Sequence, residues 1–352
     1  MHPHTLAGLA GTVFLAVTAL AQTPTNTPPT PTATPSAPAP TSAPTPTLQR
    51  SASLATPAQA PPAPPSPDLP AQVSLSLEPS RFSVSLASSG DFFFNADLES
   101  GDGSLSVNRW DTDLTLAYSL SRSVQVTLAL GSELSFYDIR SGEEFLAGSP
   151  RPISDAFIYN VSPGFRYAID DTWSVIGGFT VQQSGEFDTD FDLGLTGGAF
   201  AAVRYKVSDT LAITAGLGGN TRLEDPAIVF PIIAVEWRIT DRVRLTPRPL
   251  GIGLEADLDA AATLRATVEA GVRFREFRLA ESNPLPSGIF TDTSVPIAFG
   301  LTWTPRRQFT LGVRGGFNVF QEIEIENSEG GTLSEIEIDP APFVGVFASI
   351  GF

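Results

Sequence analysis

Apolar side chains alternate with small or polar ones, with a period of two, through most of the chain from about Phe82 onward. In one such unit Phe157, Tyr159 and Val161 share a face, and the pattern resumes at Trp173 after the turn Asp170-Asp171-Thr172. Two alternating runs joined by Asp, Ser or Thr predict a β-hairpin with a tight turn. The same unit recurs at Leu114–Phe136, Leu193–Leu217, Val229–Leu245 and Val295–Val319.

Longer acidic segments that contain Gly and Pro separate these hairpins, as at Arg140–Asp155 and Glu281–Thr293. Short turns on one side and long loops on the other are typical of transmembrane barrels. A soluble sandwich or lipocalin would also alternate, but its second face would be rich in Lys and Glu. Here that face is mainly Gly, Ser, Thr and Ala, which suits a confined lumen.

Aromatic residues fall into two groups along the predicted strands, as in the two interfacial girdles of a membrane barrel. One group lies near the short turns and the other near the long loops. The first comprises Tyr118, Tyr167, Trp173, Tyr205, Trp237 and Trp303; the second comprises Phe136, Phe157, Tyr159, Phe179, Phe317 and Phe320.

The final segment, Pro342–Phe352, reads PFVGVFASIGF, and its alternate residues up to Phe352 lie on one face of a strand. This ending resembles the C-terminal signal of bacterial outer-membrane β-barrel proteins. The resemblance implies a porin-like protein in the outer membrane of a Gram-negative bacterium. It also implies outer-membrane lipid and lipopolysaccharide as surroundings and the barrel assembly machinery as a partner during biogenesis.

The predicted fold is therefore all-β, a transmembrane antiparallel up-and-down β-barrel of about twelve strands. Fourteen strands is the alternative, if Val243–Ala256 forms a hairpin through Pro247 and Pro249. Twelve is preferred because proline cannot donate to a sheet ladder. Either size leaves more lumen than side chains need to fill.

The first part of the chain has a different composition. Leu6–Leu20 is apolar, and Ala19-Leu20-Ala21 fits a signal-peptidase site, so residues 1–21 are predicted to be a signal peptide. Residues 22–70 are rich in Pro, Thr and Ala and predict a disordered linker, which could serve as a tether, a glycosylated stalk or a spacer. Residues 71–352 form the predicted barrel domain.

Composition excludes several kinds of chemistry. The chain has no Cys, and its two His residues, His2 and His4, lie in the predicted signal. His-based nucleophilic dyads, general bases and metal sites are therefore absent from the barrel domain. There is no phosphate-binding glycine loop and no basic nucleic-acid patch. The sequence predicts neither an enzyme nor a nucleic-acid partner.

If the apolar face meets lipid, the other face lines the lumen, and the predicted lumen wall is net basic. Because the whole chain carries a net charge of -17, the acids must concentrate elsewhere, and many lie in or beside the long loops. The predicted pore-lining residues are Arg166, Arg204, Lys206, Arg238, Arg244, Arg265, Arg273, Arg314, Glu133, Asp192, Glu236 and Glu269.

A further acidic hairpin is predicted near the C-terminus. Extending the phase of the flanking strands places six carboxylates on the lumen side, where they form a candidate Ca²⁺ site. The alternative is a solvated acidic loop that keeps an edge from pairing. The six are Glu322, Glu324, Glu326, Glu335, Glu337 and Asp339.

Two functions fit these patterns. One is a porin-like channel for passive diffusion of small polar or anionic solutes, because fixed charges set selectivity in a narrow pore. The other is a non-conducting barrel that serves as a structural or surface anchor. In that case Arg and Glu, such as Glu236 with Arg238 and Glu269 with Arg273, would pair and hold the lumen shut.

Overall fold

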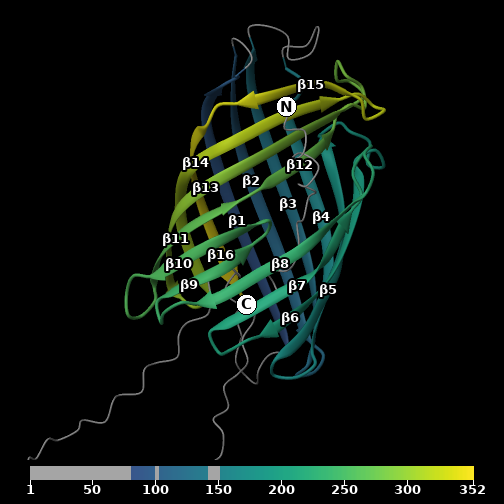
Figure 1. Ribbon diagram of the computed structural model, residues 1–352. Helices are drawn as coiled ribbons and strands as arrows, with labels where there is room; N and C mark the ends of the chain where they lie inside the picture. The colour runs from purple at the N-terminus through teal and green to yellow at the C-terminus, as the bar shows by residue number, and fades with distance from the viewer. Residues whose placement is uncertain (1–80, 100–102, 142–150) are drawn as a thin grey trace, which may run out of the picture.

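The computed structural model describes residues 81–99, 103–141 and 151–352. The predicted signal peptide (1–21) and linker (22–70) lie outside these residues, as does most of the loop predicted at Arg140–Asp155. The described chain is built from antiparallel strands in one sheet (Figure 1). No helix among these residues is long and apolar enough to cross a membrane.

The first eight strands form a continuous meander in which each pairs with the next. Tight turns stabilised by a side chain join alternate pairs; for example, the Ser121 hydroxyl accepts from the backbone N–H of Val124 at 3.1 Å. The strands are β1 (Phe82–Asp97), β2 (Gly103–Ser119), β3 (Val124–Ser141), β4 (Asp155–Ala168), β5 (Trp173–Glu186), β6 (Leu195–Lys206), β7 (Leu211–Asn220) and β8 (Ile228–Arg238).

The second half of the chain completes the sheet. β16 pairs with β1 from Ser85↔Gly351 to Phe93↔Phe343, and this pairing closes the barrel. The remaining strands are β9 (Val243–Arg248), β10 (Gly251–Asp257), β11 (Leu264–Gly271), β12 (Arg273–Arg278), β13 (Ile289–Arg306), β14 (Phe309–Glu326), β15 (Thr332–Ile338) and β16 (Ala341–Gly351).

The described residues form a barrel of fourteen strands. β11 and β12 are two parts of one strand along β13, and β15 and β16 are two parts of one strand along β14. The structure has the alternative count rather than the preferred twelve, because β9 and β10 form a hairpin in which Pro247 pairs with Ile252. Pro247 lies beyond the last residue of β9 that pairs with β8, and proline is tolerated at such an edge.

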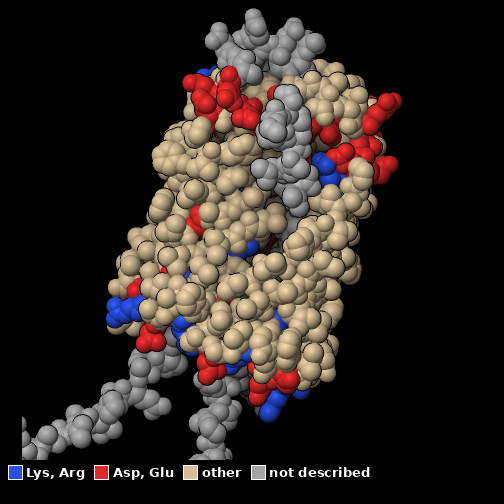
Figure 2. All heavy atoms as spheres, in the orientation of Figure 1, with Lys and Arg blue, Asp and Glu red and all other residues tan. Residues whose placement is uncertain are grey.

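The outer surface carries the predicted apolar belt. Tyr167, Trp173 and Trp237, near the short turns, are exposed, as are Phe136 and Phe317 near the long loops. Among the predicted girdle residues, Phe157 is an exception. It is buried and packs on Phe187, with ring centroids 5.7 Å apart. Figure 2 shows acidic side chains toward both ends of this face and few charges on the belt between them.

The two ends of the barrel differ in construction. The end with the short turns, here the turn end, is bounded by all fourteen strands. Toward the other end, the loop end, β6 to β10 stop early and β12 crosses toward β5, which it meets at Arg278↔Gly185 (Figure 1).

The loop end is filled by a core inside the barrel, here the upper core. Phe93 stacks on Phe343 with centroids 4.9 Å apart, and Tyr137 lies edge-on to Phe290 at 5.1 Å. The inward face of the strands is therefore apolar here, although it is polar at the turn end. The upper core includes Phe93, Leu105, Val107, Tyr137, Ile139, Ile158, Phe277, Phe290, Ile323, Ile325, Ile336, Ile338 and Phe343.

Candidate functional site: the barrel lumen

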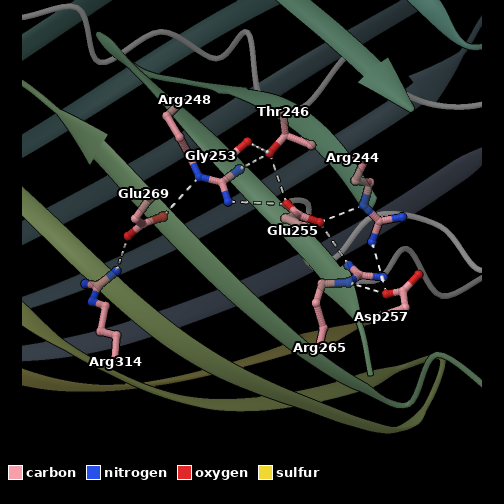
Figure 3. A network of polar contacts seen from close by, with 9 residues as sticks. All are labelled: Arg244, Thr246, Arg248, Gly253, Glu255, Asp257, Arg265, Glu269 and Arg314. Atoms are coloured by element: carbon pink, nitrogen blue, oxygen red, sulfur yellow. Dashed lines mark hydrogen bonds and ion pairs between the residues drawn. The ribbon is translucent and has the colours of Figure 1, made fainter. Parts of the chain in front are cut away.

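Below the upper core, the lumen is lined by charged side chains that bond to one another across neighbouring strands. On β9 to β11 the centre of the network is Glu255, which is 1% exposed. Its carboxylate accepts from Arg244 at 2.7 Å and from Arg265 at 3.2 Å (Figure 3). Arg248 and Thr246 also donate to Glu255, at 3.3 Å and 3.1 Å. Three guanidinium groups thus surround one buried carboxylate.

The network continues around the wall through a second carboxylate. Glu269 on β11 accepts from Arg248 at 3.0 Å and lies 3.9 Å from Arg314 on β14 (Figure 3). Arg314 in turn donates twice to Asp91 on β1, both at 2.7 Å, and Arg273 approaches the same carboxylate at 3.4 Å. The ion pairs therefore join the last strands of the barrel to the first.

A third group lies directly beneath the upper core. Asp292 on β13 is fully buried and accepts from Arg109, from the Tyr137 hydroxyl at 2.9 Å and from Gln321 at 3.0 Å. Arg275 on β12 donates to Glu133 at 2.9 Å. Arg109 and Arg275 are also almost fully buried, so each guanidinium group is shielded from water and paired with a buried carboxylate.

The wall formed by β6 to β8 carries charges only near the turn end. Arg204 donates to Glu236 at 2.7 Å, and Lys206 lies 2.6 Å from Asp209 in the adjoining turn. Arg238 donates to the backbone carbonyl of Asp209 at 2.9 Å. Farther from the turns, the inward side chains of this wall are mainly apolar, and the apolar ones include Phe200, Ala202, Phe230 and Ile232.

A cavity of about 220 Å³ lies in the lumen between β1, β2, β11, β13 and β16. Side chains of both signs line it: Asp111, Asp113 and Glu269 are acidic, while Arg248 and Arg314 are basic. Thr267, Thr302 and Ser349 add hydroxyl groups. The cavity is thus suited to water and small polar solutes.

Most predicted pore-lining residues lie on the inward phase of their strands, but Asp192 does not. It is exposed in the loop between β5 and β6, because β6 begins only at Leu195. Arg and Glu do pair between neighbouring strands, but with other partners than the examples Glu236 with Arg238 and Glu269 with Arg273: Glu236 bonds to Arg204, and Glu269 bonds to Arg248. Neighbouring strands bring side chains closer than two positions along one strand do.

Five residues central to the network were not among the predicted ones: Asp91, Arg109, Glu255, Arg275 and Asp292. Asp91 shares the inward phase of β1 with Ser85 and Ala87, so strand phase alone would have placed it in the lumen. Arg275 follows the break at Val272, where no alternating pattern announces a new strand.

The acidic hairpin has the opposite orientation to the predicted one. Ile323, Ile325 and Ile338 point inward and are buried in the upper core, while Glu322 and Glu324 point outward. The cause is an irregularity in β14: Asn318 and Gln321 both face inward, with two consecutive exposed residues between them. Each such bulge reverses the alternation.

The outward carboxylates form a ladder in which Glu322 pairs with Glu337 and Glu324 pairs with Glu335. Among the residues that the structure describes, no group of three or more acidic side chains is placed to hold a metal ion. The predicted Ca²⁺ site at Glu322, Glu324, Glu326, Glu335, Glu337 and Asp339 therefore gains no support from the geometry.

Outside the membrane belt, local contacts shift several carboxyl groups. Lys206 holds the pKa of Asp209 below its ordinary value through a hydrogen bond. The backbone N–H of Leu264 likewise lowers the pKa of Asp259 in its turn. At the tip of the acidic hairpin, burial and the neighbouring charge of Glu324 raise the pKa of Glu326 to about 7.

Comparison with known proteins gives matches in structure only. No protein-family model and no curated protein matches the sequence. The COG4313 outer membrane channel from Pseudomonas putida F1 is similar with a TM-score of 0.42 and 9% identity, covering 78% of this chain and 96% of that chain. A deltaS2 mutant of the TodX monoaromatic hydrocarbon channel is similar with a TM-score of 0.41 and 9% identity, covering 80% of this chain and 93% of that chain. The KdgM porin is similar with a TM-score of 0.32 and 8% identity, covering 76% of this chain and 99% of that chain.

The class of the molecule follows from its own construction. The barrel is closed, its outer belt is apolar, and aromatic side chains lie toward both ends of that belt. The protein is an outer-membrane β-barrel. Such barrels lie in the outer membrane of Gram-negative bacteria with their short turns in the periplasm. The charged cavity of this outer-membrane β-barrel therefore lies toward the periplasm, and its upper core lies toward the cell surface.

Proposed function

We propose that the protein is an outer-membrane channel for the passive passage of small solutes. The observation that supports this proposal is the charged lumen around the 220 Å³ cavity. A barrel that served only as a scaffold would gain nothing from burying Glu255 or Asp91, because paired buried charges are no more stabilising than well-packed apolar side chains. A polar lining is of use where water and solutes pass.

Polar solutes of either charge, with a weak preference for anions, fit this lumen. A net basic wall favours anions, but most of its guanidinium groups bond to carboxylates. Arg314 with Asp91 and Arg244 with Glu255 are examples. Paired charges largely cancel each other's field at a distance, so the selectivity expected from Arg and Lys is reduced.

A non-conducting structural barrel is the second candidate, and the upper core favours it. Phe277, Phe290 and Ile323 are fully buried inside the barrel, so they obstruct a straight path along its axis. In that case the ion pairs would only fix the shape of the wall.

Single-channel conductance of the refolded full chain in planar bilayers, under a salt gradient, separates the two candidates. We expect small ohmic steps and a reversal potential close to zero, shifted slightly toward anions. Glu269→Gln removes a carboxylate that neutralises Arg248 and Arg314, so it should increase the anion preference. Glu329→Gln, in the exposed turn of the acidic hairpin, is the matched control. A stably inserted barrel without conductance would leave the structural candidate.

A further inference from the structure

The wall of the barrel has a seam between β8 and β9. Only two residue pairs join these strands, Trp237↔Leu245 and Arg238↔Arg244. By contrast, the other edge of β8 pairs with β7 without interruption from Trp237 to Ile228. Among the described strands, the edge of β8 from Ile228 to Glu236 therefore has no partner on the β9 side.

The ends of the neighbouring strands create this seam. β9 stops at Arg248, and the chain turns back through Leu250, which has a positive φ of 46°. At the tip, Gly251 pairs with Gly271, and a Cβ on Gly251 would lie only 2.4 Å from the carbonyl oxygen of Ala270. After β11 ends at Gly271, the chain passes Val272 and continues as β12, away from the tip.

β12 forms the upper border of the seam and is held there from outside. Arg222, in the loop between β7 and β8, donates to Glu276 at 2.6 Å and lies over the ring of Phe274 at 5.3 Å. Arg278 forms an ion pair with Glu224 of the same loop. The border therefore does not depend on pairing between β12 and β8.

The seam lies within the thickness of the membrane. Trp237 belongs to the aromatic group near the short turns, and Val229 lies eight residues farther along β8. At about 3.3 Å per residue this is roughly 26 Å of strand, comparable with an apolar band about 25 Å tall. Val229 and Ile233 are 75% and 76% exposed, more than the rest of the apolar belt.

An open strand edge facing hydrocarbon is unfavourable, and it is tolerated at membrane depth where it lines a cavity. Figure 2 shows a hollow in the middle of this face, and Figure 1 places β8 and β12 on either side of it. The unpaired edge of β8 thus borders a hollow in the outer wall, on the side of β8 that faces β12.

The lumen wall beside the seam is mainly apolar. Ile176, Phe200 and Ala202 form a cluster on which Ile232 of β8 packs, and Phe230 is buried on the same face. The ion pairs of β9 to β11 begin only on the other border of the seam. A molecule that enters from the membrane therefore meets apolar side chains first and charged ones later.

We propose that the seam is a lateral route by which small apolar or amphipathic molecules pass between the hydrocarbon region of the membrane and the lumen cavity. The route avoids the upper core, which obstructs the barrel axis. This inference rests on the proposed function, because it adds a second solute class, which enters from the membrane, to the polar solutes of the same channel.

The test uses 1-N-phenylnaphthylamine, a small apolar dye that fluoresces in membranes, and cells that express the full chain in an outer membrane otherwise slow to admit it. Ala234→Trp fills the lumen side of the seam, and Ile232→Glu places a carboxylate there. Leu217→Trp, on the lipid-facing side of β7, is the matched control. Gel mobility with and without heating verifies that each variant folds.

We expect wild type and Leu217→Trp to take up the dye several-fold faster than cells without the protein, and both seam variants to lose that increase. Ion conductance should persist in Ile232→Glu, since a charge at the seam does not obstruct the polar cavity. Conductance without dye uptake would overturn the lateral route and leave the channel. Dye uptake unchanged in both seam variants would also overturn the route. Absence of both activities would overturn the channel as well.

Discussion

Removing the carboxylate of Asp292 should destabilise the barrel strongly. Asp292 is fully buried and is the ion-pair partner of Arg109, whose own exposure is 1%. Asp292→Ala leaves this guanidinium buried without its counter-ion, which costs about 3 to 5 kcal/mol. Tyr137 and Gln321 lose an acceptor in the same step. We therefore expect a loss near the upper end of that range.

The measurement is urea unfolding of the protein in lipid vesicles, followed by tryptophan fluorescence. The double variant Arg109→Met with Asp292→Leu removes both charges and should recover most of this loss, since apolar replacements of a buried pair are often neutral or better. The part that is not recovered reflects the acceptor that Tyr137 and Gln321 lose. A loss of less than about 1 kcal/mol for Asp292→Ala would refute the reasoning, because it would mean that water reaches Arg109. The region beneath the upper core would then be wet.

Three other changes test separate features. Phe290→Ala empties part of the upper core, so it should lower the free energy of unfolding by about 3 to 5 kcal/mol and raise the conductance. The lipid-facing control Phe299→Ala should not raise the conductance. Equal conductance in the two variants would contradict the idea that the upper core obstructs the barrel axis. The pKa of Glu326 is raised to about 7, so its ionisation opposes the folded hairpin: the stability of the hairpin is highest below the ordinary pKa of Glu and falls as pH rises through 7. Protease cleavage at the Asn327–Gly331 turn should therefore become faster over that pH range, and more so in wild type than in Glu326→Gln. Parallel pH profiles of the two proteins would contradict this. Glu324→Lys converts the like-charge pair of Glu324 and Glu335 into an opposite-charge pair, which should stabilise the acidic hairpin by about 0.2 to 1 kcal/mol. Urea unfolding measures this gain, and Glu324→Gln should give an intermediate value. A loss of stability in Glu324→Lys would contradict the proposed ladder of carboxylates.

The class of fold could be predicted from the sequence because a period of two is a local property. Each hairpin shows its own alternation and turn, and the pairing of Tyr118 with Val126 or Tyr167 with Val175 follows from such turns. The hairpin through Pro247 was harder to predict, because proline is excluded from a sheet only where its N–H would be needed. The sequence does not state which edge of β9 is free.

The orientation of side chains could be predicted only as far as the alternation is unbroken. The irregularities after Phe93 in β1 and at Ser294 in β13 interrupt it. Because the alternation reverses at Val319 and Phe320, extending the phase across these residues predicts the wrong face of the acidic hairpin to point inward. Partners in the network depend on the register of the whole barrel, so the meeting of Arg109 with Asp292 could not be found from either strand alone.

Closure of the barrel by β1 and β16 has a consequence for how the protein is made. Ser85 of β1 pairs with Gly351 of β16. Among the described strands, β1 is synthesised first and β16 last, so one edge of β1 stays unpaired until the whole barrel has been synthesised. Loop closure over such sequence distances is slow, and the waiting chain exposes apolar strands that favour aggregation. A β1 variant with a weakened apolar face should therefore remain soluble longer during export but insert more slowly, so that safe transit and rapid assembly place opposing demands on the same residues.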